Sequence, residues 1–207
     1  MSSSKTAPSP TLCAVKIGLI SDIHCNLGGL LGALRELSDC EEILCAGDLL
    51  YQYRFPQAVL GLLNERGVRA IVGNHDRTIL CTPSHPLRAS VDPVALAYLA
   101  EIPRMLSLNL DGVRVAVFHG APWDDPDSTS ATYIYPENQD ALRRVAQVDA
   151  DVVVLGHTHR GFAVRVDGTL IVNPGSCGEP RDGTDLLSCA VLDTRDGQVE
   201  FSQMAAR

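Results

Sequence analysis

The stretch VKIGLISDIH, residues 15–24, decides how this chain folds. It begins as an apolar run with β-branched residues, which predicts a strand, and it ends in the polar residues Ser21 and Asp22. The leucines that follow lie at the spacing of an amphipathic helix, at positions 27, 30, 31, 34 and 37. A strand that leads directly into a helix indicates an α/β fold.

The alternation of strand and helix continues toward the middle of the chain. Pro56 lies just before an expected helix and Gly67 just after it, as is common at helix starts and ends. Asp92 and Pro93 together are a helix start, an N-cap followed by proline in the first turn. The expected elements are strands over 42–46 and 68–72 and helices over 57–66 and 94–101.

The second half of the chain is built mainly from hairpins. The dipeptide DG, a strong hairpin signal, occurs at 111–112, 167–168 and 196–197. We therefore expect an α/β sandwich of two mixed β-sheets flanked by helices, with residues 14–207 as a single domain and 1–13 as a flexible leader. The expected hairpin strands are 105–110 with 113–118, 162–166 with 169–172, and 190–192 with 198–201; a loop over 121–136, a helix over 137–147 and a strand over 151–155 lie between them.

Composition and charge narrow the class of protein. Hydrophobic residues make up 45% and charged residues 20% of the 207, which is typical of a folded domain. No apolar run approaches the roughly 20 residues of a transmembrane helix, and no secretory signal is expected. Seven cysteines without regular spacing predict reduced thiols and a cytoplasmic location. The net charge of −8 argues against duplex nucleic acid, and it would repel any anionic substrate unless a cation is bound locally.

Side chains that can bind metals follow five of the expected strands. Five of the six histidines are among them, and only His85 lies elsewhere. The carboxyl ends of strands in an open α/β sheet converge on one edge, so we expect these residues to form one cluster. They are Asp22 and His24, Asp48, Asn74 with His75 and Asp76, His119, and His157 with His159.

Each of these groups has an ordinary structural interpretation when it is taken alone. Asp22 could cap a helix, Asn74 could occupy a turn, and His119 could be a hydrogen-bonded core histidine. Taken together, imidazoles favour first-row transition metals, and a carboxylate can bridge two cations. A single structural zinc would use about four ligands and leave the others without a role, so the set fits two divalent ions better.

The ordered motifs resemble the signature of the calcineurin-like metallophosphoesterases, and within them the small prokaryotic phosphodiesterase branch. The likeness extends from about Lys16 to Asp193. It implies the calcineurin-like phosphoesterase fold and an enzyme that hydrolyses phosphate esters, foremost phosphodiesters. The matching segments are DIH at 22–24, GD at 47–48, GNHD at 73–76, HG at 119–120, GHTH at 156–159 and NPGS at 173–176.

The resemblance also implies a role for each residue. Two divalent ions (Mn, Fe, Zn, Ni or Co) would activate a bridging hydroxide, which attacks phosphorus in line with the leaving oxygen. His75 would be the general acid for the leaving group, and Asp76 would orient or charge it unless it only caps a helix or turn. The first ion would be held by Asp22, His24 and His159 and the second by Asn74, His119 and His157, with Asp48 bridging both.

The residues that recognise the substrate stay open at this point. Arg77, Arg160 and Arg181 follow motif residues, and they could contact phosphate oxygens or be surface arginines. Tyr51 and Tyr53 lie in a loop that departs from the family pattern, and they could stack on a base or pack against the protein.

Two further residues also have two interpretations. Cys25 stands where this branch usually has glycine, and it could sense oxidation or simply be a small buried residue. Trp123 follows His119 in the chain, and it could line the pocket or anchor the loop.

We expect a small phosphate-ester substrate. Two bound dications would bring the charge from −8 to −4 and concentrate positive charge at one place. An alternative is a non-catalytic scaffold on the same fold, such as the phosphoesterase-like subunit of retromer, but this chain retains all seven ligands and His75. A metallohydrolase for amide or ester bonds would use the same metal chemistry, although nothing beyond the metals points to a carbonyl substrate.

Overall fold

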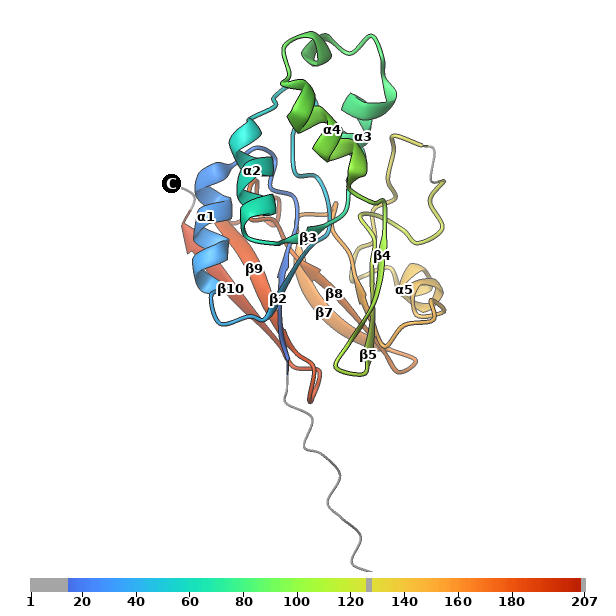
Figure 1. The fold of residues 1–207 in the computed structure, drawn as a ribbon. Helices are drawn as coiled ribbons and strands as arrows, with labels where there is room; N and C mark the ends of the chain where they lie inside the picture. The colour runs from blue at the N-terminus through green and yellow to red at the C-terminus, as the bar shows by residue number, and fades with distance from the viewer. Residues whose placement is uncertain (1–14, 126–127, 206–207) are drawn as a thin grey trace, which may run out of the picture.

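The computed structural model describes residues 15–125 and 128–205, and the predicted leader over 1–13 lies outside them. Two five-stranded sheets pack face to face, and helices cover their outer faces (Figure 1). The predicted sandwich of two mixed sheets is confirmed.

The first sheet has the strand order β10-β9-β1-β2-β3. Strands β1, β2 and β3 run parallel to one another, and helices connect them. Strand β9 pairs antiparallel with both β1 and β10. The bounds are β1 (Lys16–Ile20), β2 (Glu42–Cys45), β3 (Arg69–Ala70), β9 (Leu186–Asp193) and β10 (Val199–Ala205).

The second sheet has the order β4-β5-β6-β8-β7. Hairpins at its two edges pair antiparallel, and the three inner strands run parallel. Asp111 and Asp167 have positive φ in the tight turns of these hairpins, which confirms two of the three predicted DG turns. The bounds are β4 (Leu106–Leu110), β5 (Val113–Val117), β6 (Val152–Val154), β7 (Gly161–Val166) and β8 (Thr169–Pro174).

Five α-helices and one short 3-10 helix occur in the described part of the chain. The side chain of Asn26 caps the first helix through the Gly29 amide, and Asp92 caps α4 just before Pro93. None of the described helices has the length and apolar character needed to cross a membrane. The bounds are α1 (Leu27–Glu36), α2 (Gln57–Glu65), α3 (Asn74–Cys81), η1 (Pro86–Ala89), α4 (Pro93–Glu101) and α5 (Gln139–Val145).

The alternation of side chains along β1 divides the core into layers. Ile17 and Leu19 point between the two sheets, whereas Ile20 joins the layer between the first sheet and its helices. A third cluster lies between the second sheet and α5. All of β1 after Lys16 is therefore buried, which explains why its sequence is a continuous apolar run.

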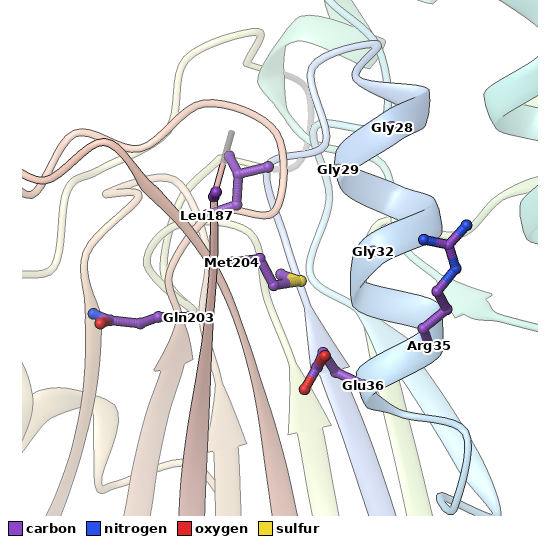
Figure 2. Close-up of a pocket in the computed structure, with 9 residues that line it drawn as sticks. Gly28, Gly29, Gly32, Arg35, Glu36, Leu187, Gln203 and Met204 are labelled. Carbon is purple, nitrogen blue, oxygen red and sulfur yellow. The ribbon is translucent and has the colours of Figure 1, made fainter. Parts of the chain in front are cut away.

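Helix α1 contacts the rest of the protein closely through its glycines. A Cβ atom on Gly29 would lie 1.9 Å from the carbonyl oxygen of Cys177, so only glycine fits there. The absence of side chains also leaves a groove of about 310 Å³ between α1 and the β9-β10 edge. Figure 2 shows Met204 pointing toward Gly32 across this groove. Glu36, the last residue of α1, also lines the groove.

Several elements differ from the sequence prediction in their presence or their bounds. Helix α3 was not expected, because its first turn is polar and only Ile79 is a fully buried apolar residue. Strand β3 has two ladder residues rather than five, since the chain leaves the sheet after Ala70. Strand β9 begins at Leu186 rather than at residue 190, because it pairs along the whole of β10.

Candidate metal centre

The predicted ligands come together where strands of both sheets end. Asp22 and His24 follow β1, Asp48 follows β2, and Asn74 is the first residue of α3. The second sheet contributes His119 after β5 and the pair after β6. Most of these side chains are buried: Asp22, His24, Asp48, His119, His157 and His159.

The backbone at this junction is strained in a way that is rare elsewhere. Eight non-glycine residues in the described ranges have positive φ, and five of them are predicted ligands. Such conformations cost about 1–3 kcal/mol each and persist where the surrounding structure fixes them, often at functional sites. The five ligands are Asp22, His24, Asp48, His157 and His159.

The first cluster consists of Asp22, His24 and His159, whose ligand atoms all lie within 4.8 Å of one another. The Nε2 atom of His159 is 3.3 Å from Oδ1 of Asp22 and 3.0 Å from Nε2 of His24. The opposite ring nitrogen of His159, Nδ1, hydrogen-bonds the carbonyl oxygen of Glu179. That contact fixes the ring so that Nε2 faces the cluster.

The second cluster consists of Asp48, His119 and His157. Nδ1 of His119 is 2.7 Å from the carbonyl oxygen of Ala46, which again directs Nε2 inward. This Nε2 lies 3.2 Å from Oδ2 of Asp48 and 3.0 Å from Oδ1 of Asn74. The amide oxygen of Asn74 therefore joins the second cluster.

Asp48 lies between the two clusters. Its Oδ2 atom is 3.7 Å from Nε2 of His24 in the first cluster and 3.2 Å from Nε2 of His119 in the second. Its other oxygen accepts a hydrogen bond of 2.9 Å from the backbone amide of His75. A carboxylate in this position can bind a cation on either side.

Electrostatics keep both carboxylates ionised. Burial opposes the charge on Asp22, but the nearby imidazole of His159 lowers the pKa of Asp22 overall. Burial likewise opposes the charge on Asp48, and the neighbouring His119 outweighs it, so the pKa of Asp48 falls. Each buried carboxylate is thus paired with one imidazole.

The other two histidines lose their charge. Burial lowers the pKa of His24 to about 4, although Asp48 and Asp22 oppose the shift. Burial and the charge of His119 lower the pKa of His157 to about 4. A neutral imidazole has a free lone pair, which is the form that binds a metal.

Two buried atoms of the site indicate that a cation would fit there. Within the described part of the chain, Oδ1 of Asp22 and Nε2 of His157 are buried without a hydrogen-bond partner. Buried polar atoms are normally satisfied, so unpartnered acceptors that face a cluster of further acceptors call for a positive ligand. The Asp, Asn and His donors suit a first-row divalent ion.

Asp76 anchors the backbone around the site. Its carboxylate accepts hydrogen bonds from the amides of Leu49 at 3.1 Å, Leu50 at 2.8 Å and Gly73 at 2.9 Å. Both of its oxygens are therefore used on backbone donors rather than on His75. This corresponds to the capping alternative. Asp76 thereby holds the loop after β2, which contains Asp48, against the start of α3.

His75 lies at the mouth of the site. Its ring stacks on Tyr51 with centroids 4.8 Å apart and meets the ring of His24 edge-on at 5.1 Å. Burial lowers the pKa of His75, so its imidazolium is a stronger acid than free histidine. His24, Asp48 and His75 form a further group of side chains that could hold a metal ion together.

Cys25 supports the loop that contains Tyr51. Its sulfur accepts a hydrogen bond of 3.0 Å from the amide of Tyr51 and donates one of 3.2 Å to the carbonyl oxygen of Arg54. Burial raises the pKa of the Cys25 thiol to about 11, which leaves it protonated and unreactive. The structure thus favours a packing role over oxidation sensing. The six described cysteines are free thiols.

The predicted substrate residues take different positions. Arg77 is buried and lines a cavity of about 280 Å³ together with the ligands Asn74 and His119. Arg160 pairs with Glu137 at 2.9 Å, at the surface. Arg181 pairs with Glu179 at 2.9 Å, and its charge acts on both His75 and His159.

The loop after β5 holds residues that sequence reasoning missed. Tyr133 stacks on the ligand His157 with centroids 3.9 Å apart, and Tyr135 lies next to it. No periodicity or motif marks these tyrosines; their only signal is that they follow His119 in the same loop. Trp123 anchors this loop, because the guanidinium of Arg144 lies 3.9 Å above its ring.

Comparisons with known proteins show which proteins this chain resembles. A family model described as the calcineurin-like phosphoesterase superfamily domain matches residues 15–197. A protein of Methanothermobacter thermautotrophicus named "Probable metallophosphoesterase" is 28% identical over 168 residues, covering 80% of this chain and 78% of that protein. An uncharacterised protein of Methanocaldococcus jannaschii is 26% identical, covering 89% and 85%. The crystal structure of a metallophosphoesterase from Sphaerobacter thermophilus has a TM-score of 0.73 and 25% identity, covering 94% and 90%.

Proposed function

The chain belongs to the calcineurin-like phosphoesterase superfamily, and from this premise we propose that it is a dinuclear metal-dependent phosphodiesterase. The observation that carries the proposal is the pair of clusters with Asp48 between them, since it offers two adjacent cation positions. The seven proposed ligands are Asp22, His24 and His159 for one ion, Asn74, His119 and His157 for the other, and Asp48 for both.

The residues of the chain would divide the chemistry between them. When bound, the two ions would supply Lewis acidity and lower the pKa of a water molecule to near neutrality. Asp48 would hold the two positions at a fixed separation, and the Glu179 and Ala46 carbonyls would keep His159 and His119 turned inward. His75 would protonate the oxygen of the leaving group from the mouth of the site.

The charge of the chain supports a diester over a monoester. The protein carries a formal charge of −8, and a phosphodiester has one negative charge where a monoester has up to two. Arg77 in the cavity beside Asn74 and Arg181 near His75 are the cations that would bind the remaining phosphate oxygens. Tyr51 would contribute by holding the His75 ring, and Arg160 would act at the rim.

A scaffold without catalysis would not need this arrangement. It would gain nothing from ionised buried carboxylates, five ligands with strained backbone, or a histidine held at the mouth of the cluster. These features cost stability, so their presence together favours an enzyme over the scaffold alternative.

Metal analysis followed by a substrate panel tests the proposal. Protein loaded with manganese, iron(II), zinc, nickel or cobalt should contain two ions per chain by elemental analysis. It should hydrolyse bis(p-nitrophenyl) phosphate faster than p-nitrophenyl phosphate, and Asp48→Asn should lose both metal and turnover. Absence of turnover with all five metals would refute the proposal, and faster hydrolysis of p-nitrophenyl acetate would favour the carbonyl hydrolase.

A further inference from the structure

Four of the five tyrosines in the sequence lie around the candidate metal centre. Tyr51 and Tyr53 come from the loop after β2, and Tyr133 and Tyr135 come from the loop after β5. The fifth, Tyr98, belongs to α4 and packs against the core between the first sheet and its helices. The two pairs have different surroundings, which separates their roles.

The Tyr51 ring is already in use. One contact is the stack on His75 at 4.8 Å, and the guanidinium of Arg54 lies over the ring at 5.4 Å. The ring also meets His24 and Tyr53 edge-on at 5.7 Å. Tyr51 is thus a positioning residue for His75, and it offers little surface to a ligand.

The second pair is open to solvent. Tyr133 is 47% exposed and Tyr135 is 37% exposed, and their rings are parallel within 5° with centroids 5.8 Å apart. Tyr133 stacks at the same time on the ligand His157, at 3.9 Å and 24°. A ring bound here would therefore lie beside the proposed second ion.

The loop holds these two rings in place before any ligand binds. The carboxylate of Asp124 accepts hydrogen bonds from the Ala121 amide at 2.9 Å, the Thr132 amide at 2.8 Å and the Thr132 hydroxyl at 2.6 Å. Ile134, between the two tyrosines, is 2% exposed and is buried in the core beside α5. Aromatic side chains that are already held in place bind a ligand at a low entropy cost, so these two rings are preorganised for binding.

Two arginines lie at the rim of this surface, each paired with a glutamate. The guanidinium of Arg160 lies 5.5 Å from the Tyr135 ring centroid. Burial opposes the charge on Arg181, but its hydrogen bond to Glu179 raises the pKa of Arg181, with smaller contributions from the nearby Tyr133 and Asp22. A ligand that stacks on the tyrosines would therefore have positive charge within reach of its phosphate.

We propose that Tyr133 and Tyr135 form a stacking surface for a planar aromatic group of the phosphate ester. This group is the part of the substrate that the two ions do not bind. This inference rests on the proposed function and narrows the substrate to esters of aryl groups or nucleosides. Stacking of a base on an aromatic side chain contributes about 1–3 kcal/mol, so removal of the surface should weaken binding about 5-fold to 150-fold.

Calorimetry with non-hydrolysed ligands tests the surface without relying on turnover. Manganese-loaded protein should bind phenylphosphonate about 10-fold more tightly than cyclohexylphosphonate, which has similar size but no planar ring. The same comparison between the 5′-methylenephosphonate analogues of adenosine 5′-monophosphate and ribose 5-phosphate separates the two sources of the ring. A preference in the first pair alone indicates an aryl ester, and one in both pairs indicates a nucleoside. Equal affinities within both pairs would overturn the surface.

Variants assign the preference to the two rings. Tyr133→Leu and Tyr135→Leu should each reduce the ratio of the two affinities, whereas Tyr133→Phe, which retains the ring, should preserve the ratio. In the described part of the chain, the Tyr135 ring has contacts with Tyr133 and Arg160 and no ring contact with a proposed ligand, so its variant tests the surface apart from the metals. Metal content is measured in each variant. If only Tyr133→Leu lowers the ratio and it also loses metal, Tyr133 supports His157 and the surface is refuted.

The outcomes also separate this inference from the proposed function. Turnover of bis(p-nitrophenyl) phosphate with no preference for planar ligands would leave the phosphodiesterase in place and remove the stacking surface. Absence of both turnover and phosphonate binding in protein that retains two ions would remove both.

Discussion

His75 connects the proposed bridging ligand to the mouth of the site. Its backbone amide donates to Oδ1 of Asp48 at 2.9 Å, and its ring lies between Tyr51 and His24. The main chain of this residue would thus position the ions while its side chain meets the leaving group. A substitution of the side chain leaves the backbone contact intact, so the two roles can be separated.

Replacement of His75 tests its role as a proton donor. His75→Asn should lower kcat by about 100-fold or more for a diester with an alkyl leaving group, in the range of general acid catalysis. It should have a much smaller effect when p-nitrophenolate leaves, because that anion needs no proton. Steady-state kinetics on the two substrates, with metal content measured in parallel, check the prediction.

His85 provides the matched control. It lies before η1, where its Nδ1 atom accepts a hydrogen bond from the Leu87 amide at 3.3 Å. His85→Asn keeps an acceptor at this cap and should change neither substrate's kcat. An equal loss for both leaving groups in His75→Asn would show that the residue supports the metals or the fold instead.

The residue types of the site could be read from the sequence, but their individual partners could not. Asp, His and Asn after successive strands predicted the cluster because strand ends converge. Nothing in the sequence indicated that Asp76 would use both oxygens on the amides of Gly73, Leu49 and Leu50. The contacts with Leu49 and Leu50 join residues that are 27 and 26 positions apart in the sequence, so they depend on the path of two separate loops.

At the scale of elements, the start of α3 packs tightly against the loop after β2. Gly73 precedes this helix, and a Cβ atom there would lie 2.2 Å from Oδ1 and 2.3 Å from the amide nitrogen of Asp48. The helix can approach the loop after β2 only because residue 73 has no side chain. Asn74 and Asp48 are brought to the same ion position by this approach.

Gly73→Ala should therefore damage the site more than the fold. The added methyl group would displace Asp48 or Asn74 by about 1 Å, and displacements of that size can cost about 100-fold in rate. We expect loss of metal affinity and of kcat/KM, measured by titration of the metal and by turnover of a nitrophenyl diester. Unchanged metal affinity would contradict the proposed role of Asp48.

Gly61 in α2 is the matched glycine. A Cβ atom there would meet nothing within 4 Å, and the residue is exposed. Gly61→Ala should stabilise the protein by about 0.5–1 kcal/mol and leave metal affinity unchanged, since alanine favours the helix. Chemical denaturation of the two variants separates the local clash from a general effect of alanine.

Elements were predictable where periodicity or turn chemistry is strong. The leucine spacing of α1 and the DG turns at Asp111 and Asp167 each produced the expected element. Helix α3 was missed because its first residues, Asn74 to Arg77, are selected for the site rather than for amphipathic packing. Strand β3 is short for a related reason, since Ile71 and Val72 lead out of the sheet toward Gly73.

At the scale of the whole molecule, the site lies on the seam between the two sheets. Asp22, His24, Asp48 and Asn74 come from the half of the chain that builds the first sheet and its helices, and His119, His157 and His159 come from the second sheet. The sheets otherwise meet through an apolar layer. Bound ions would therefore cross-link the two halves at one edge of the sandwich.

The acidic side chains of the protein include a buried pair at this seam and a larger group at the surface. Asp22 and Asp48 are buried and face the histidines, whereas carboxylates such as Asp149 and Asp140 lie at the surface and pair with arginines. Cations at the seam would neutralise the buried pair and leave a negative surface around it. A small ester can reach such a site, but a long polyanion would be repelled by the surroundings.

Removal of metal should consequently destabilise the entire protein. An ion present at about 100 times its dissociation constant stabilises the folded state by about 2.7 kcal/mol. For a chain of this size, that corresponds to a fall in Tm of about 5–10 °C on chelation. Differential scanning calorimetry with and without EDTA measures the shift, and added manganese should restore it. Asp48→Asn, which removes the ligand shared by both positions, should show a much smaller shift. A shift of equal size in that variant would place the stabilising ions elsewhere in the molecule.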